Sequence, residues 1–290
     1  MKRENIKIRW LTTTGFEVVL PNGKVILFDP WLGKSDYPEM NMDLNLNIED
    51  LTGADYIFIS HIHFDHAEDV AAIADHFKKD TYGGRIYCPA LSCKAFADYY
   101  DIPYREIIPS FPGEIFETDD FTVEILPCRH LGDEGAPIGP RPSTNIARAK
   151  ERGADDYEIL SGALGSLEEM DLAITIKESG FRFMFLGGRL YRFNNIYEKC
   201  KTFYPNFVIR QLSPGFSPQV YAKICKNYNA PIIFPSHHDS HHLEKVRNTT
   251  YEKYFNEVNE ELIKMNSSTR VINIERLKWY EIGVYCCELK

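Results

Sequence analysis

The stretch YIFISHIHFDHAED, residues 56–69, decides how the rest of the chain is interpreted. It opens with a short apolar run, which is typical of a buried central strand. Three of the nine histidines and an aspartate follow within the next six residues. His61 and His63 are spaced so that both side chains of an extended or tightly looped segment face one point, and Asp65 and His66 begin the following helix. Because imidazole suits zinc, iron and related metals and a carboxylate neutralises charge, this pattern predicts a metal site.

The same pattern of an apolar strand followed by histidine occurs twice more. VEILPCR leads to His130, and PIIFPS leads to His237 and His238, of which we favour His237 because it comes first. Strands of one sheet layer that end at the same edge would bring these histidines to the first cluster. The resulting five histidines and one aspartate exceed the needs of one tetrahedral ion. They suit two metals about 3.5–4 Å apart around a bridging water.

The remaining patterns indicate a mixed α and β chain that forms a single domain over residues 1–290. An Asn-Gly pair at 22–23 predicts a hairpin between two strand-like runs, and ESG at 178–180 predicts a second hairpin within 170–188. Ser217 followed by Pro218 marks the start of a helix. A polar segment at about 131–170 is long for a connection, so we expect a lid or specificity insertion. Further strands are expected at 5–13, 16–20, 24–30, 85–89, 121–127, 206–212 and 230–236, and helices at 67–79, 90–100, 196–203 and 251–265.

Composition limits the classes of function. The net charge of −9 makes nucleic acid an unexpected partner, because phosphate-backbone binders are usually basic. The sequence has no long apolar run for a membrane span and no signal-peptide pattern at its start. Seven scattered cysteines fit reduced thiols in a cytoplasmic protein better than a disulfide framework. The pattern does not determine the oligomeric state and leaves a homo-oligomer open.

The motif HIHFDH resembles the HxHxDH signature of the metallo-β-lactamase superfamily. GFEVVLPNGKVILFDPWL resembles the opening hairpin of that superfamily, and NAPIIFPSHHD its last metal strand, so the resemblance covers roughly residues 5–240. The DPW and PSHHD segments are most similar to the branch of ascorbate-phosphate lactonase-like proteins and N-acyl-phosphatidylethanolamine phospholipase D. The resemblance implies an α+β fold, a four-layer αββα sandwich with metals at one edge.

The resemblance also implies roles for individual residues. His61, His63 and His130 would hold one metal, and Asp65, His66 and His237 would hold the other. Asp29 would orient a ligand histidine, since ligating imidazoles usually donate their second N–H to an acceptor. The ions implied are Zn²⁺, one or two per chain, with Mn²⁺ or Fe²⁺ as alternatives.

The sequence departs from the superfamily at the metal-bridging aspartate. The expected Gly-Asp pair is Gly187-Gly188 here, and Arg189 follows. Without a shared carboxylate, two neighbouring dications repel more strongly. Three alternatives follow: one metal site acts alone, another group substitutes for the aspartate, or catalysis is lost. The substitutes considered are the carboxylates of Asp239 and Glu134 and the imidazoles of His238, His241 and His242.

The leading hypothesis from the sequence is a metal-dependent hydrolase acting on an ester-type small molecule, either a lactone or a phosphodiester. Asp65 would orient or deprotonate water in addition to binding metal, and Arg189 would hold an anionic group of the substrate. The alternative is a catalytically degenerate protein that binds a metabolite or partner. A nuclease is disfavoured by the acidic composition.

Overall fold

The computed structural model describes residues 5–34, 42–78, 85–128, 169–187, 194–212, 215–239 and 243–283. Within these ranges the strands form two sheets of seven. The first sheet has the order β14-β1-β2-β3-β4-β5-β6 and the second the order β13-β12-β11-β10-β9-β8-β7. The strands are β1 Ile6–Trp10, β2 Phe16–Val19, β3 Val25–Phe28, β4 Tyr56–Phe58, β5 Ile86–Pro89, β6 Ile107–Ser110, β7 Ile115–Glu117, β8 Phe121–Cys128, β9 Glu169–Ile176, β10 Arg182–Leu186, β11 Phe207–Gln211, β12 Ile232–Ser236, β13 Arg270–Val271 and β14 Trp279–Ile282.

Each sheet combines antiparallel hairpins with parallel strands. In the first sheet β14, β1, β2 and β3 pair antiparallel, and β3 to β6 run parallel. In the second, β7 to β10 pair antiparallel and β10 to β13 run parallel. Both predicted hairpins, β2–β3 and β9–β10, are confirmed. Their turns contain Gly23 and Gly180, whose φ values of 86° and 65° suit a residue without a Cβ.

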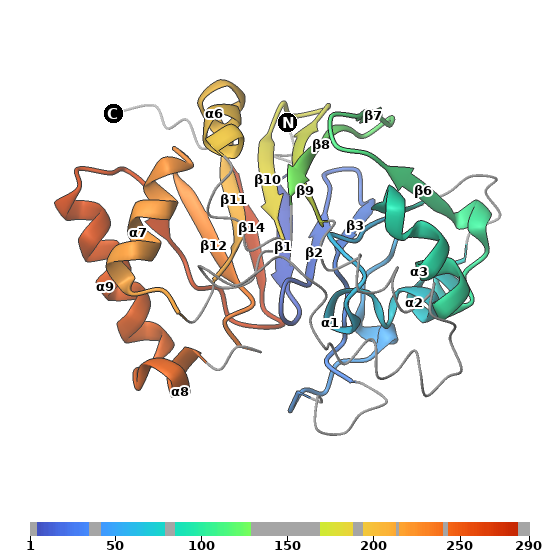
Figure 1. The fold of residues 1–290 in the computed structure, drawn as a ribbon, viewed down its shortest axis with the longest axis horizontal. Coiled ribbons are helices and arrows are strands. Elements are labelled where there is room, and N and C mark those ends of the chain that lie inside the picture. The colour runs from blue at the N-terminus through green and yellow to red at the C-terminus, as the bar shows by residue number, and fades with distance from the viewer. Residues whose placement is uncertain are drawn as a thin grey trace.

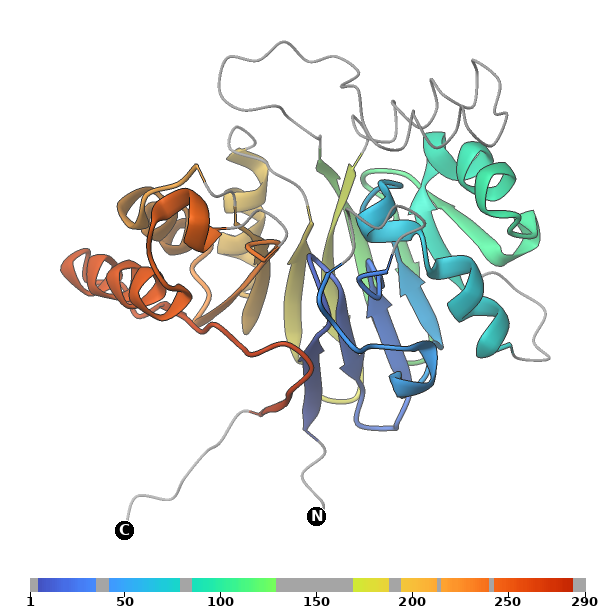
Figure 2. The same ribbon diagram turned by 90° about the horizontal axis from the view of Figure 1, so that it is seen from below.

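Helices cover the outer faces of the paired sheets. Figure 1 shows α2 and α3 on one side and α7 and α9 on the other, and Figure 2 shows the strands between these two groups of helices. The α-helices are α1 Phe64–Ala67, α2 Val70–His76, α3 Cys93–Tyr100, α6 Asn194–Phe203, α7 Pro218–Asn227, α8 Leu243–Arg247 and α9 Tyr251–Lys264, with short 3-10 turns at Ile48–Asp50, Ala90–Ser92 and Tyr104–Glu106.

Three apolar clusters hold these layers together. The central cluster takes side chains from both sheets, including Phe28, Phe58 and Phe185. One outer cluster joins the first sheet to α2 and α3, and the other joins the second sheet to α6, α7 and α9. Burial of these faces on both sides of each sheet explains the nearly continuous apolar runs in the central strands. The four-layer αββα sandwich expected from the sequence is confirmed.

The structure corrects three details of the sequence predictions. The histidine-bearing strand ends do not belong to one sheet layer, because β4 lies in the first sheet and β12 in the second. The strands β6 and β7 were not predicted. The boundary of the polar insertion at residue 170 was slightly too late, since β9 already begins at Glu169. Among the described residues, none of the helices has the length and apolar character that a bilayer span requires.

Candidate metal centre

Side chains from both sheets converge at one edge of the sandwich. Asp65 and His66 lie in α1, directly after β4, and His237 follows β12. One ligand atom from each of the three lies within 4.8 Å of the others. Nε2 of His237 is 3.4 Å from Asp65 Oδ2, and Nε2 of His66 is 3.8 Å from Asp65 Oδ1. Two atoms bound to one tetrahedral zinc lie roughly 3.4 Å apart, so this donor set fits a divalent ion.

A second pair of donors lies beside this group. Nε2 of His61 is 2.7 Å from Nδ1 of His63, and the ring of His61 lies 3.9 Å from the ring of His66. The two nitrogens lie within hydrogen-bonding distance of each other, so both rings reach the same place in the cluster. The structure therefore brings together five of the six predicted metal ligands. The sixth, His130, lies outside the described residues.

Asp29 contacts His66 on the side of the ring that faces away from Asp65 and His237. Its Oδ2 lies 2.8 Å from Nδ1 of His66 and accepts hydrogen bonds from Ser60 Oγ at 2.7 Å and Thr14 Oγ1 at 2.8 Å. Ser60 Oγ is in turn 3.1 Å from Nδ1 of His61. Because an ionised carboxylate only accepts, His66 must carry its proton on Nδ1, which leaves Nε2 facing Asp65 and His237. This contact is what the predicted orienting role of Asp29 requires.

Glu169 is a buried carboxylate at the same edge that sequence reasoning missed. Its side chain is fully buried at the start of β9, and Oε1 lies 3.6 Å from Nδ1 of His61. Its Oε2 accepts a hydrogen bond from Cys128 Sγ at 3.3 Å. The available signal was an acidic residue at the head of an otherwise apolar strand. Glu169 thus lies beside Nδ1 of His61, as Asp29 lies beside Nδ1 of His66.

The charges of the cluster support ion binding. Burial alone would raise the pKa of Asp65, but neighbouring His66 and His237 outweigh it and hold that pKa well below its usual range. Burial alone would lower the pKa of His66, but Asp29 and Asp65 raise it above its ordinary value. The centre is thus an arrangement of anions and proton-binding imidazoles, and a cation bound there would displace protons from the ligands.

Three residues at this edge adopt a left-handed backbone conformation that is unusual for residues other than glycine. The φ values are 43° for Thr13, 41° for Asp29 and 63° for His237. Such conformations cost roughly 1–3 kcal/mol each and persist only where the surroundings enforce them. At this edge the three conformations are held by the contacts that bring the side chains together.

Gly187 allows the first sheet to approach the second at the centre. A Cβ atom at this position would lie 2.6 Å from Cβ and 2.7 Å from Oγ of Ser60. Since real side chains do not pack this closely, only glycine lets Ser60 reach both Asp29 and His61. The first glycine of the Gly187-Gly188 pair therefore has a packing role.

The two predicted substitute ligands within the described residues point elsewhere. His238 is fully buried and stacks on Trp10 at a ring distance of 4.6 Å, with Tyr251 and Phe255 edge-on to it. Burial lowers its pKa to about 4. The carboxylate of Asp239 accepts a hydrogen bond from the Thr13 backbone N–H at 3.1 Å and lies 3.7 Å from Arg276.

Several predictions concern residues that the structure does not describe. They are the ligand His130, the glycine at 188, the anion-binding Arg189, the alternative donors Glu134, His241 and His242, and the insertion up to residue 168.

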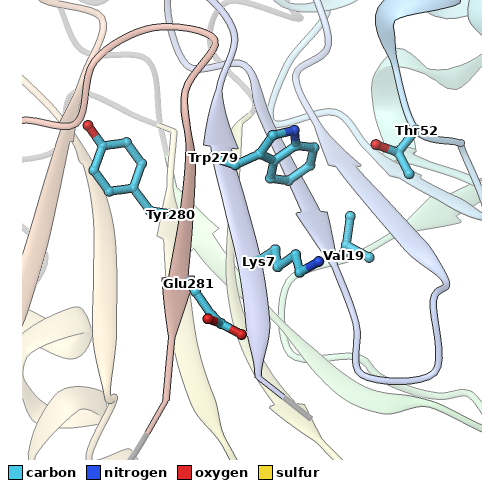
Figure 3. A pocket seen from close by; sticks show the side chains of 6 residues that line it. All are labelled: Lys7, Val19, Thr52, Trp279, Tyr280 and Glu281. Atoms are coloured by element: carbon cyan, nitrogen blue, oxygen red, sulfur yellow. The ribbon is translucent and has the colours of Figure 1, made fainter.

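A pocket of about 390 Å³ lies elsewhere, on β14, β1 and β2 (Figure 3). Its lining residues are Lys7, Val19, Thr52, Trp279, Tyr280 and Glu281. Lys7 and Val19 lie toward the end of the sheet opposite Asp29. None of the residues that line this pocket belongs to the histidine cluster, so we place the candidate centre at the cluster.

Comparisons with known proteins agree with this fold. Residues 24–153 match the family model described as Beta-lactamase superfamily domain. A UPF0173 metal-dependent hydrolase from Anaeromyxobacter sp. (strain K) is 38% identical over 72 residues, 25% of this chain and 24% of that protein. Another from Thermodesulfovibrio yellowstonii is 31% identical over 140 residues, 47% of this chain and 49% of that protein. The chain thus spans about a quarter to a half of the length of these relatives.

Similarity in structure extends over nearly the whole chain. The metallo-beta-lactamase fold protein YhfI from Bacillus subtilis superposes with a TM-score of 0.55 over 96% of this chain and 100% of that chain, at 14% sequence identity. The shared fold is the metallo-β-lactamase fold, and residues 24–153 of this chain are similar to the Beta-lactamase superfamily domain.

Proposed function

We propose that the protein is a metal-dependent hydrolase acting on a small, anionic, ester-type substrate, a lactone or a phosphodiester. The observation that carries the proposal is the convergence of Asp65, His66 and His237 beside the His61–His63 pair. One or two divalent ions bound there, with Zn²⁺ the first choice and Mn²⁺ or Fe²⁺ as alternatives, would polarise a substrate oxygen and activate water near neutral pH. The names of the relatives support the reaction type.

Asp65 is the residue of this group that substrate and water can reach. Its side chain is 15% exposed, against 1% for His66 and 6% for His237. Because its pKa is held low, the carboxylate is ionised at neutral pH and accepts a hydrogen bond from the attacking water. We assign it the role of orienting that water, because a carboxylate whose pKa is held this low accepts a hydrogen bond more readily than a proton.

The finer parts of the proposal concern substrate and setting. We assign Arg189 to hold the anionic group of the substrate, and the insertion at about 131–170 to set specificity. The five cysteines in the described part of the chain are free thiols, which supports a reducing, cytoplasmic setting.

A second candidate function is the binding of a metabolite or partner without turnover. It is favoured by glycine at position 188, where the superfamily resemblance implies a metal-bridging aspartate. Metal content separates the two candidates, because a degenerate site would retain well below one ion per chain even after incubation with zinc, manganese or iron.

The test compares wild type with His63→Ala and with His76→Ala. His76 is an exposed histidine of α2 and serves as the matched control. Elemental analysis gives metal content, and a panel of lactones and chromogenic phosphodiesters gives turnover. We expect His63→Ala to lower metal content and abolish turnover, and His76→Ala to change neither. Unchanged hydrolysis by protein stripped of metal would refute the proposal.

A further inference from the structure

The turn Thr12-Thr13-Thr14-Gly15 lies between β1 and β2 and touches both halves of the candidate centre. Its three threonines are fully buried. Backbone hydrogen bonds between Leu11 and Gly15 at 2.8 Å and between Gly15 and Thr12 close the turn. A Cβ at Gly15 would lie 3.0 Å from the carbonyl oxygen of Asp29, so glycine permits the turn to pack against that residue. Superfamily motifs in the sequence gave no role to these threonines.

Thr13 connects the two sheets through three different polar groups. Its Oγ1 donates to the backbone carbonyl of Asp65 at 2.9 Å. Its carbonyl accepts from the backbone N–H of His237 at 2.7 Å, and its own N–H donates to Asp239 at 3.1 Å. Thr13 thus bonds to the backbone of two candidate metal ligands: Asp65, which follows a strand of the first sheet, and His237, which follows a strand of the second.

These bonds link two donors that no shared strand or helix connects. Asp65 follows a strand of the first sheet and His237 a strand of the second, so no secondary structure fixes their distance. His237 also holds a φ of 63°, which costs free energy that the bond to Thr13 helps to offset. Yet Asp65 Oδ2 and His237 Nε2 lie 3.4 Å apart, a separation suited to a shared ion.

We propose that Thr13 is a positioning residue that holds Asp65 and His237 at metal-binding separation. The inference rests on the proposed metal site and adds to it the residue that joins its two halves. Thr14 performs a related task within the first sheet, since its Oγ1 lies 2.8 Å from both Asp29 Oδ2 and His66 Nδ1. Thr12 does not, because its Oγ1 donates to the carbonyl of Trp31 at 2.7 Å.

The test uses Thr13→Val, which keeps the branched shape and the backbone bonds and removes only the hydroxyl. Thr12→Val is the matched control, since it removes an equally buried hydroxyl from the same turn. Zinc affinity is measured by competition with a chromophoric chelator, and the stability of metal-free protein by urea unfolding. Partners behind metal ligands typically contribute 10–100-fold in affinity, so we expect about a 10-fold loss for Thr13→Val. Thr12→Val should keep wild-type affinity with a similar loss of stability, and Thr13→Ser should restore affinity.

Three outcomes would overturn the inference. Wild-type affinity in Thr13→Val would show that the hydroxyl does not position the donors. An equal loss of affinity in Thr12→Val would show that only the general stability of the turn matters. A wild-type protein that binds no ion would refute the proposed metal site as well, whereas the first two outcomes leave that site intact. If Thr13→Val does not fold, Thr13→Cys, with a similar shape and a much weaker donor, replaces it in the same comparison.

Discussion

Replacing Asp29 by asparagine should weaken metal binding without removing a metal ligand. The carboxylate is fully buried and accepts from Ser60 N, Ser60 Oγ, Thr14 Oγ1 and His66 Nδ1 at 2.6–2.8 Å. An amide has the same shape but only one accepting oxygen. With that oxygen toward Ser60 N, the amide NH₂ faces the remaining donors, and the charged acceptor that favours the Nδ1 proton of His66 is lost.

The expected loss of metal affinity follows from the resulting change in the tautomer of His66. A proton on Nε2 of His66 turns the atom that faces Asp65 and His237 from an acceptor into a donor. Loss of a carboxylate behind a ligating histidine typically lowers metal affinity 10–100-fold, or about 1.4–2.8 kcal/mol. Loss of charge assistance from three buried hydrogen bonds should also lower the free energy of unfolding by roughly 3 kcal/mol.

Asp120 provides a matched control at the opposite end of the sandwich, before β8. It is also a buried carboxylate with several donors, accepting from Asn22 at 2.6 Å, Lys24 at 2.8 Å and Tyr56 at 2.6 Å. Asp120→Asn should therefore reduce stability without affecting zinc affinity. Chelator competition gives the affinities, and ¹H–¹⁵N imidazole spectra give the tautomer of His66. Wild-type affinity in Asp29→Asn, or an equal loss in Asp120→Asn, would refute the reasoning.

Three further predictions test other contacts of the fold and the centre. Glu169→Gln should weaken zinc binding about 10-fold by removing the carboxylate behind His61, and chelator competition would detect it. Gly187→Ala should cost about 1–3 kcal/mol in urea unfolding because its Cβ overlaps Ser60. For Asp120, burial opposes but its three donors prevail, so its pKa is lowered on folding. Its contribution to stability should therefore be present above about pH 4 and disappear as the pH falls further, so the difference between wild type and Asp120→Asn should shrink there.

Local patterns in the sequence were sufficient to predict the elements that carry the histidines. The spacing of His61 and His63 places both rings on one side of the chain as long as this segment is extended, as it is at His63. The hairpins and the Ser217 cap, whose hydroxyl accepts from Val220 N–H, depend on a few neighbouring residues. Because such features depend on residues close together in the sequence, they can be predicted without knowing the rest of the fold.

Contacts between the two sheets could not be predicted in the same way. Glu169 approaches His61 only because β9 and β4 belong to sheets that pack face to face, and no pattern near residue 169 specifies that partner. Thr13 reaches His237 and Asp239 through its backbone, and those two bonds cannot be predicted from its residue type. The sequence also placed the histidine strands in a single layer, because strand ends alone do not reveal which sheet contains each strand.

The positions of the buried carboxylates bear on the missing bridging aspartate. A carboxylate behind a ligating imidazole lies roughly 6 Å from any dication which that imidazole holds, and at an effective dielectric constant of about 20 it attracts the ion by roughly 5 kcal/mol. Glu169 supplies this charge behind His61, and Asp29 supplies it behind His66. Glycine at position 188 removes a ligand that two metal ions would share. The carboxylates of Asp29 and Glu169, which contact the ligand imidazoles, still offset repulsion between two such ions. The donor set therefore has more charge compensation than the sequence motif alone implies, which favours a metal-binding centre over a degenerate one.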